Sequence, residues 1–139
     1  MKIVVKRKSY WQLAVFTLAL VGIPIGVAFL LGDAIPEVYV TKFMLLYTAI
    51  AITLLLGYMT VTGRAYWING GPSYEETAAD PYRAFVFLRR HFVRFGIGTL
   101  IYTLVMVPSF LLLAPWAFDV FAFCVTLIAS AVSTVRVKF

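Results

Sequence analysis

The sequence predicts an all-α integral membrane protein with four transmembrane helices arranged as two hairpins. The first observation is composition, since 63% of the residues are hydrophobic and only 13% are charged, far from the balance of a soluble domain. The second is a set of long uncharged runs, three of them at least as long as the roughly 20 residues that cross a hydrocarbon core. The third is the placement of the basic residues, which indicates a membrane orientation. Long apolar runs without alternation favour helices over a β-barrel.

The predicted helices cover about residues 10–31, 43–62, 95–113 and 116–135, and we expect residues 1–139 to form one domain. In the first helix, Tyr10 and Trp11 suit the membrane interface, and Pro24 permits a bend. Gly22 and Gly26 are four residues apart, a spacing that lets another helix approach closely. The alternative interpretation of this proline and its glycines is a hinge or a broken helix at a substrate site.

The short segment 33–41 is predicted to be an external loop, after which Lys42 begins the second helix. The fourth helix carries a ridge of small residues at a spacing of four, which is the strongest helix-packing signal in the chain. This ridge consists of Ala122, Thr126, Ser130 and Thr134. Asp119 lies in the first turn of the same helix, where the helix N-terminus stabilises it and where it can pair with Lys42 across the outer mouth of the bundle.

The central segment 63–94 is the only long polar stretch, and its local signals are specific. Residues 69–72 read Asn-Gly-Gly-Pro, a turn cluster. Ser73 and Glu76 form a capping box that starts a short helix. Asp80 followed by Pro81 is a second helix start, and we expect that helix to continue into the third membrane span.

The basic residues predict that both termini and the central segment are cytoplasmic. Eleven of the twelve Lys and Arg residues fall on that side, and Lys42 alone falls on the other. The eleven are Lys2, Lys6, Arg7, Lys8, Arg64, Arg83, Arg89, Arg90, Arg94, Arg136 and Lys138. The expected location is therefore the inner cell membrane, with a multi-pass topology.

Four arginines of the central segment are the predicted contact surface outside the lipid. Arg83, Arg90 and Arg94 fall on one stripe of a juxtamembrane amphipathic helix, and Arg89 lies beside them. They suit either the phosphates of anionic lipids or an acidic surface of a protein partner, and the two interpretations are compatible.

The sequence contains no group of residues typical of a catalytic, metal or phosphate-binding site. It has neither a nucleophile with a neighbouring base nor a set of metal ligands nor a phosphate-binding glycine loop, so we expect no enzyme, no cofactor and no metal. The basic charge is explained by topology rather than by nucleic acid. The leading hypothesis is an accessory or assembly subunit of a larger membrane complex, with protein partners or as a homo-oligomer. A small oligomeric transporter or channel and an anionic-lipid-binding membrane protein are the alternatives.

Overall fold

The computed structural model describes residues 8–139 and is all-helical. Its long helices are α1 (Trp11–Leu31), α2 (Glu37–Thr62), α4 (Pro81–Leu111) and α5 (Trp116–Thr134). A 3₁₀ turn, η1 (Ala65–Trp67), and a short helix, α3 (Tyr74–Ala79), connect α2 to α4. All four long helices are long and apolar enough to cross a membrane, as the sequence predicts.

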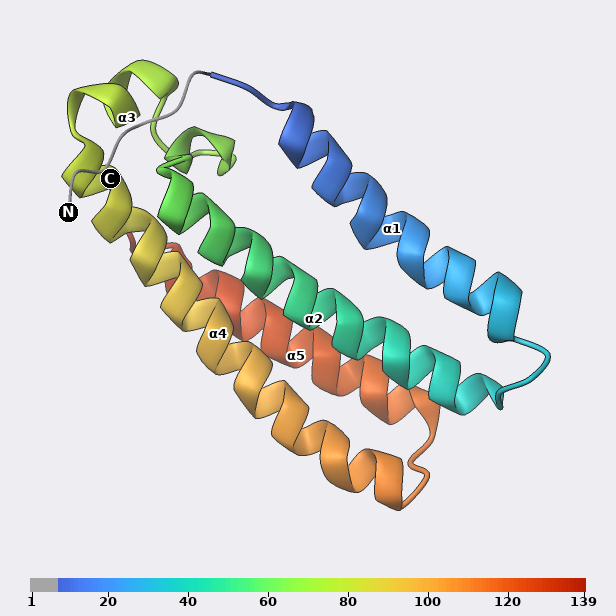
Figure 1. Cartoon of the computed structure of the whole chain (residues 1–139). Coiled ribbons are helices and arrows are strands. Elements are labelled where there is room, and N and C mark those ends of the chain that lie inside the picture. Colours follow the sequence, from blue (N-terminus) through green and yellow to red (C-terminus); the bar gives the residue numbers. More distant parts are fainter. Residues whose placement is uncertain (1–7) are drawn as a thin grey trace.

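The helices form a three-helix core with a fourth helix beside it (Figure 1). Helices α2, α4 and α5 pack on one another, while α1 packs mainly against α2. The short connections 32–36 and 112–115 lie together at one end, called here the hairpin end. The other end, called the polar end, holds η1, α3 and residues 135–139. Lys2, Lys6 and Arg7 lie outside the described residues.

Helix α2 begins at Glu37, whereas the sequence predicts Phe43, so most of the expected external loop is helical. Pro36 precedes the helix, and Glu37 lies in its first turn, where an acidic side chain suits the helix N-terminus. The charge of Lys42 does not end the helix, because the side chain turns inward to a partner. The other bounds agree with the predicted ones to within two residues, except that α4 begins earlier because of the juxtamembrane extension described next.

The predicted start signals of the connecting segment are present. Ser73 and Glu76 form the capping box, with the Ser73 hydroxyl accepting from the Glu76 amide at 3.1 Å and the Glu76 carboxylate accepting from the Ser73 amide at 2.7 Å. The Asp80 carboxylate accepts from the Arg83 amide at 2.9 Å. From Pro81 the helix runs without a break through Pro108 to Leu111, as expected.

Two glycines have positions that few other residues would fit. Gly63 ends α2 in the left-handed region, at φ 67°, and its amide donates to the Met59 carbonyl. Gly98 of α4 faces Ser130 of α5 so closely that an added Cβ would overlap with the Ser130 hydroxyl. An added Cβ here would force the Ser130 hydroxyl out of its present position, so the absence of a side chain on α4 favours the close contact of the two helices.

We expect Gly98→Ala to destabilise the bundle by about 1–3 kcal/mol, because the new methyl group overlaps with the Ser130 hydroxyl. Adding Ser130→Ala removes that oxygen and should restore most of the loss. Thermal unfolding of the purified protein in one detergent measures both effects. Equal melting temperatures for the wild type and Gly98→Ala would show that the contact between α4 and α5 is looser than described.

Candidate functional site

A buried ion pair joins the three core helices at the hairpin end. Lys42 of α2 and Asp119 of α5 both have fully buried side chains, and Nζ lies 2.5 Å from Oδ2. The same ammonium donates to Ser109 Oγ of α4 at 2.7 Å and to the Ala114 carbonyl at 3.0 Å. The Ser109 hydroxyl donates in turn to Asp119 Oδ1.

Every hydrogen-bonding group of this centre has a partner. An ammonium has three N–H donors, and Lys42 uses them on three different acceptors. Each oxygen of Asp119 accepts one bond, and the carboxylate also lies in the first turn of α5, where the helix dipole favours negative charge. No donor of Lys42 is left over for a substrate, so the arrangement is that of a structural clamp.

Sequence reasoning anticipated that Lys42 and Asp119 would pair at the mouth of the bundle, and the structure adds that both side chains are fully buried. Lys42 lies inside α2 and points toward α4 and α5, where Ser109 and Asp119 are its partners. Ser109 as the third member was not foreseen. The only signal for it was a polar residue next to Pro108 in an otherwise apolar stretch.

A second buried cation lies at the polar end. Arg64 is 3% exposed, and its guanidinium lies over Trp67 at 4.5 Å and over Tyr58 at 5.6 Å from the ring centroids. Its Nε and Nη1 atoms make no hydrogen bond to a described residue. Cation–π contact with two aromatic faces therefore stabilises this charge in place of a carboxylate.

The four predicted contact arginines do not share one environment. Arg83, Arg89 and Arg90 are exposed on the polar-end half of α4. Arg83 is also engaged within the chain, because its Nη2 donates to the Phe139 carbonyl at 2.7 Å and its guanidinium lies over the Phe139 ring. Arg94 is partly buried beside α5, and its Nη1 has no partner among residues 8–139. Whether these side chains bind lipid or protein stays a prediction.

The residues predicted to mediate helix packing lie on two helices, α5 in the core and α1 beside it. Ala122 packs on the cluster of Ala49, Tyr102 and Met106, and Thr126 and Ser130 face Gly98. Thr134 lies further along α5, at a cavity of the polar end. Gly22 and Gly26 of α1 have no atom of another element within van der Waals distance of an added Cβ. The structure thus brings the α5 ridge against the core and leaves the α1 glycines without a neighbouring helix in the described chain.

Three further observations bear on chemistry. Among residues 8–139, no three His, Cys, Asp or Glu side chains gather as a metal site would require. His91 is buried in α4 with Nδ1 2.9 Å from the Phe87 carbonyl. Comparison with protein families, curated proteins and solved structures finds no match for this chain.

We expect Lys42→Met or Asp119→Leu alone to destabilise the protein by about 3–5 kcal/mol, because each leaves an uncompensated buried charge. The double variant Lys42→Met/Asp119→Leu removes both charges and should recover most of that loss. Thermal unfolding of all three variants in the same detergent gives the coupling energy. Additive losses in the double variant would show that the two charges do not depend on each other.

Proposed function

We propose that the protein is a small non-catalytic subunit of a larger membrane complex, and that α1 binds a transmembrane helix of a partner protein. The observation that carries this proposal is the outward face of α1. The core helices α2, α4 and α5 hold one another at both ends, whereas α1 is an appended helix whose only buried residue is Pro24.

The glycines of α1 point away from the core. At 100° per residue, Gly22 and Gly26 lie about 40° apart on the helix, and Pro24 lies on nearly the opposite side. Pro24 is the buried residue, so the glycine face is turned from α2. On the same face of α1, large exposed side chains lie before and after the two glycines, with Leu18 72% and Phe29 86% exposed. The face is therefore a notch of small residues between two bulky ones.

Such a notch fits another helix better than it fits lipid. In a bilayer, lipid chains are as apolar as the side chains, so helices associate through close van der Waals packing. Two glycines four residues apart permit that close approach and give little to a mobile acyl chain. We therefore favour a partner helix, from a different subunit, as the occupant. The exposed arginines of α4 would supply a second contact outside the membrane.

A transporter or channel is the second candidate, and one feature favours it. Hydroxyl groups line the interior between α2, α4 and α5, including the Thr53–Thr99 pair at 2.7 Å and the buried Tyr102 hydroxyl, which has no partner among the described residues. The cavity beside them measures about 20 Å³, room for roughly one water molecule. A path for a solute would require these helices to separate, which ranks this function below the first.

The proposal also includes the orientation of the protein in the membrane. We place the polar end in the cytoplasm and the hairpin end outside the inner cell membrane, because the basic residues gather at the polar end and Lys42 is neutralised within the bundle. This places the arginines of α4 on the cytoplasmic side.

Single cysteines introduced into a Cys124→Ser background test this orientation. Asn69→Cys at the polar end should react with a membrane-impermeant maleimide only after the cells are broken, and Asp33→Cys at the hairpin end should react in intact cells. Both positions are exposed, so accessibility of the side chain does not differ between them. The reverse labelling pattern would invert the proposed topology.

Gly22→Ile should reduce co-purification of the partner from native membranes by about tenfold or more, because the β-branched side chain fills the notch. Ala14→Ile is the matched control, since it adds bulk at another exposed position of α1, about 80° around the helix from Gly22. Neither side chain disturbs the core, so melting temperatures should match the wild type. Equal partner recovery from both variants would contradict the proposal, and a stoichiometric second copy of this chain in place of a different subunit would change the partner to a homo-oligomer.

A further inference from the structure

A cavity of about 620 Å³ opens at the polar end between α2, α4 and the residues that follow α5. This volume falls within the roughly 300–1,000 Å³ of small-molecule sites. Its floor is apolar and is formed partly by Ile52, Leu55 and Phe95. Its rim is polar and includes Asn69, His91 and Lys138. The cavity is thus apolar toward the membrane interior and polar toward the connecting segment.

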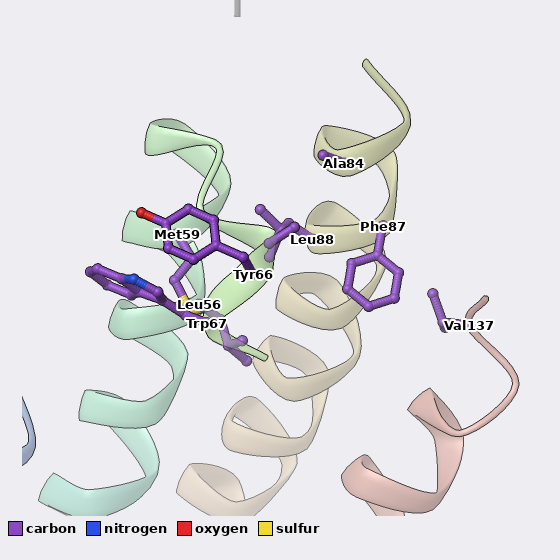
Figure 2. Packing of buried hydrophobic residues seen from close by; sticks show 9 residues of the cluster. Leu56, Met59, Tyr66, Trp67, Ala84, Phe87, Leu88 and Val137 are labelled. Atoms are coloured by element: carbon purple, nitrogen blue, oxygen red, sulfur yellow. The ribbon is translucent and has the colours of Figure 1, made fainter. Parts of the chain in front are cut away.

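Residues 135–139 form one wall of the cavity. After α5 the chain turns back toward α4, and the Val137 amide donates to the Thr134 carbonyl at 2.8 Å. The buried Val137 belongs to the same apolar cluster as Phe87 of α4 (Figure 2). The Phe139 ring meets Phe87 edge to face, with 6.0 Å between centroids, and its carbonyl accepts from Arg83. The wall is therefore held by specific contacts rather than lying loosely over the opening.

His91 presents one defined polar atom to the cavity. The ring is 8% exposed, and Nδ1 lies 2.9 Å from the Phe87 carbonyl. A carbonyl oxygen can only accept, so Nδ1 carries a proton, and Nε2 is the ring nitrogen that remains for a hydrogen bond to a ligand. No described residue bonds Nε2, and the ring lines the cavity. A ligand hydroxyl would satisfy this nitrogen.

Charge decides the class of ligand. Lys138 is exposed and is the one Lys or Arg among the residues that line the cavity. The acidic residues of this end, Glu75, Glu76 and Asp80, lie in or next to α3 and do not line the cavity. An anionic headgroup is therefore favoured at the rim, while the apolar floor suits an acyl chain.

We propose that this cavity binds one anionic glycerophospholipid whose headgroup carries a hydroxyl. The phosphate lies at Lys138, the headgroup hydroxyl, which can donate or accept, forms a hydrogen bond with His91 Nε2, and one acyl chain covers the floor between α2 and α4. This site goes beyond the proposed partner-binding function, since none of the residues that line the cavity belongs to α1. Failure of the lipid test leaves the α1 test unaffected, and the reverse also holds.

Native mass spectrometry of the purified full-length protein tests the site, with phosphatidylglycerol and phosphatidylcholine of identical acyl chains added in equal amounts. We expect one retained phosphatidylglycerol, favoured over phosphatidylcholine by about tenfold. Lys138→Gln should lower the retained fraction about fivefold, as expected for the loss of one basic residue near a lipid phosphate. Arg136→Gln removes the same charge from a neighbouring exposed residue outside the cavity and should have little effect.

A second pair of variants tests the floor. Thr134→Phe places a ring in the cavity and should abolish lipid retention, whereas Val132→Phe adds a ring at an exposed position that does not line the cavity and should not. Lys138 is exposed, so its variant keeps the test valid if Thr134→Phe fails to fold. Equal retention of the two lipids, or equal losses within either variant pair, would overturn the site and indicate adsorption at the headgroup level only. Displacement of the lipid by a co-purifying peptide or by a second copy of this chain would likewise overturn it.

Discussion

The Lys42–Asp119 ion pair is the constraint on which the arrangement of the core depends. A charge inside the bundle is costly, and it is tolerated here because Ser109 and the Ala114 carbonyl satisfy the donors and acceptors that remain. The geometry requires α2, α4 and α5 to meet in one register, since a shift of one residue on any helix would turn a partner away. The pair therefore contributes more to the uniqueness of the packing than to its net stability.

The opposite end of the core is held by different chemistry. There the chain leaves α2 through Gly63 and places the Arg64 guanidinium against Trp67 and Tyr58, while Leu56 and Leu88 fill the space toward α4 (Figure 2). Between the two ends, the close approach at Gly98 sets the distance between α4 and α5. The buried ion pair, the small-residue contact at Gly98 and the aromatic cluster thus follow one another along the bundle. Aromatic rings prefer the interface, and small residues replace the missing hydrophobic drive inside the lipid.

The sequence predicted what depends on local signals. Apolar length located the four long helices, and Ser73, Glu76 and Asp80 located the starts of α3 and α4, because capping involves residues only three apart. Features that depend on which helices pack against each other were harder to predict from the sequence. Charged residues such as Glu37 and Lys42 indicate a loop, and the expected pairing with Asp119 did not reveal that Lys42 is buried within a helix, so the start of α2 was predicted too late. The burial of Arg64 and the wall formed by Val137 and Phe139 depend on contacts between distant segments, and no local pattern contains them.

The position of α1 follows from where its contacts are. The Trp67 indole donates to the Ser9 carbonyl at 2.9 Å, and Phe16 packs on Tyr58, so the helix is fixed at the polar end. The last side-chain hydrogen bond joins Tyr47 to the Ala19 carbonyl at 3.0 Å, and past it Pro24 is the only buried residue. No hydrophobic force presses two helices together in a bilayer, so the half of α1 beyond Ala19 is held weakly against α2. The glycine notch lies in this half and on the face away from α2. A partner helix docking there would therefore displace lipid alone, and the contacts that fix α1 and the core would stay in place.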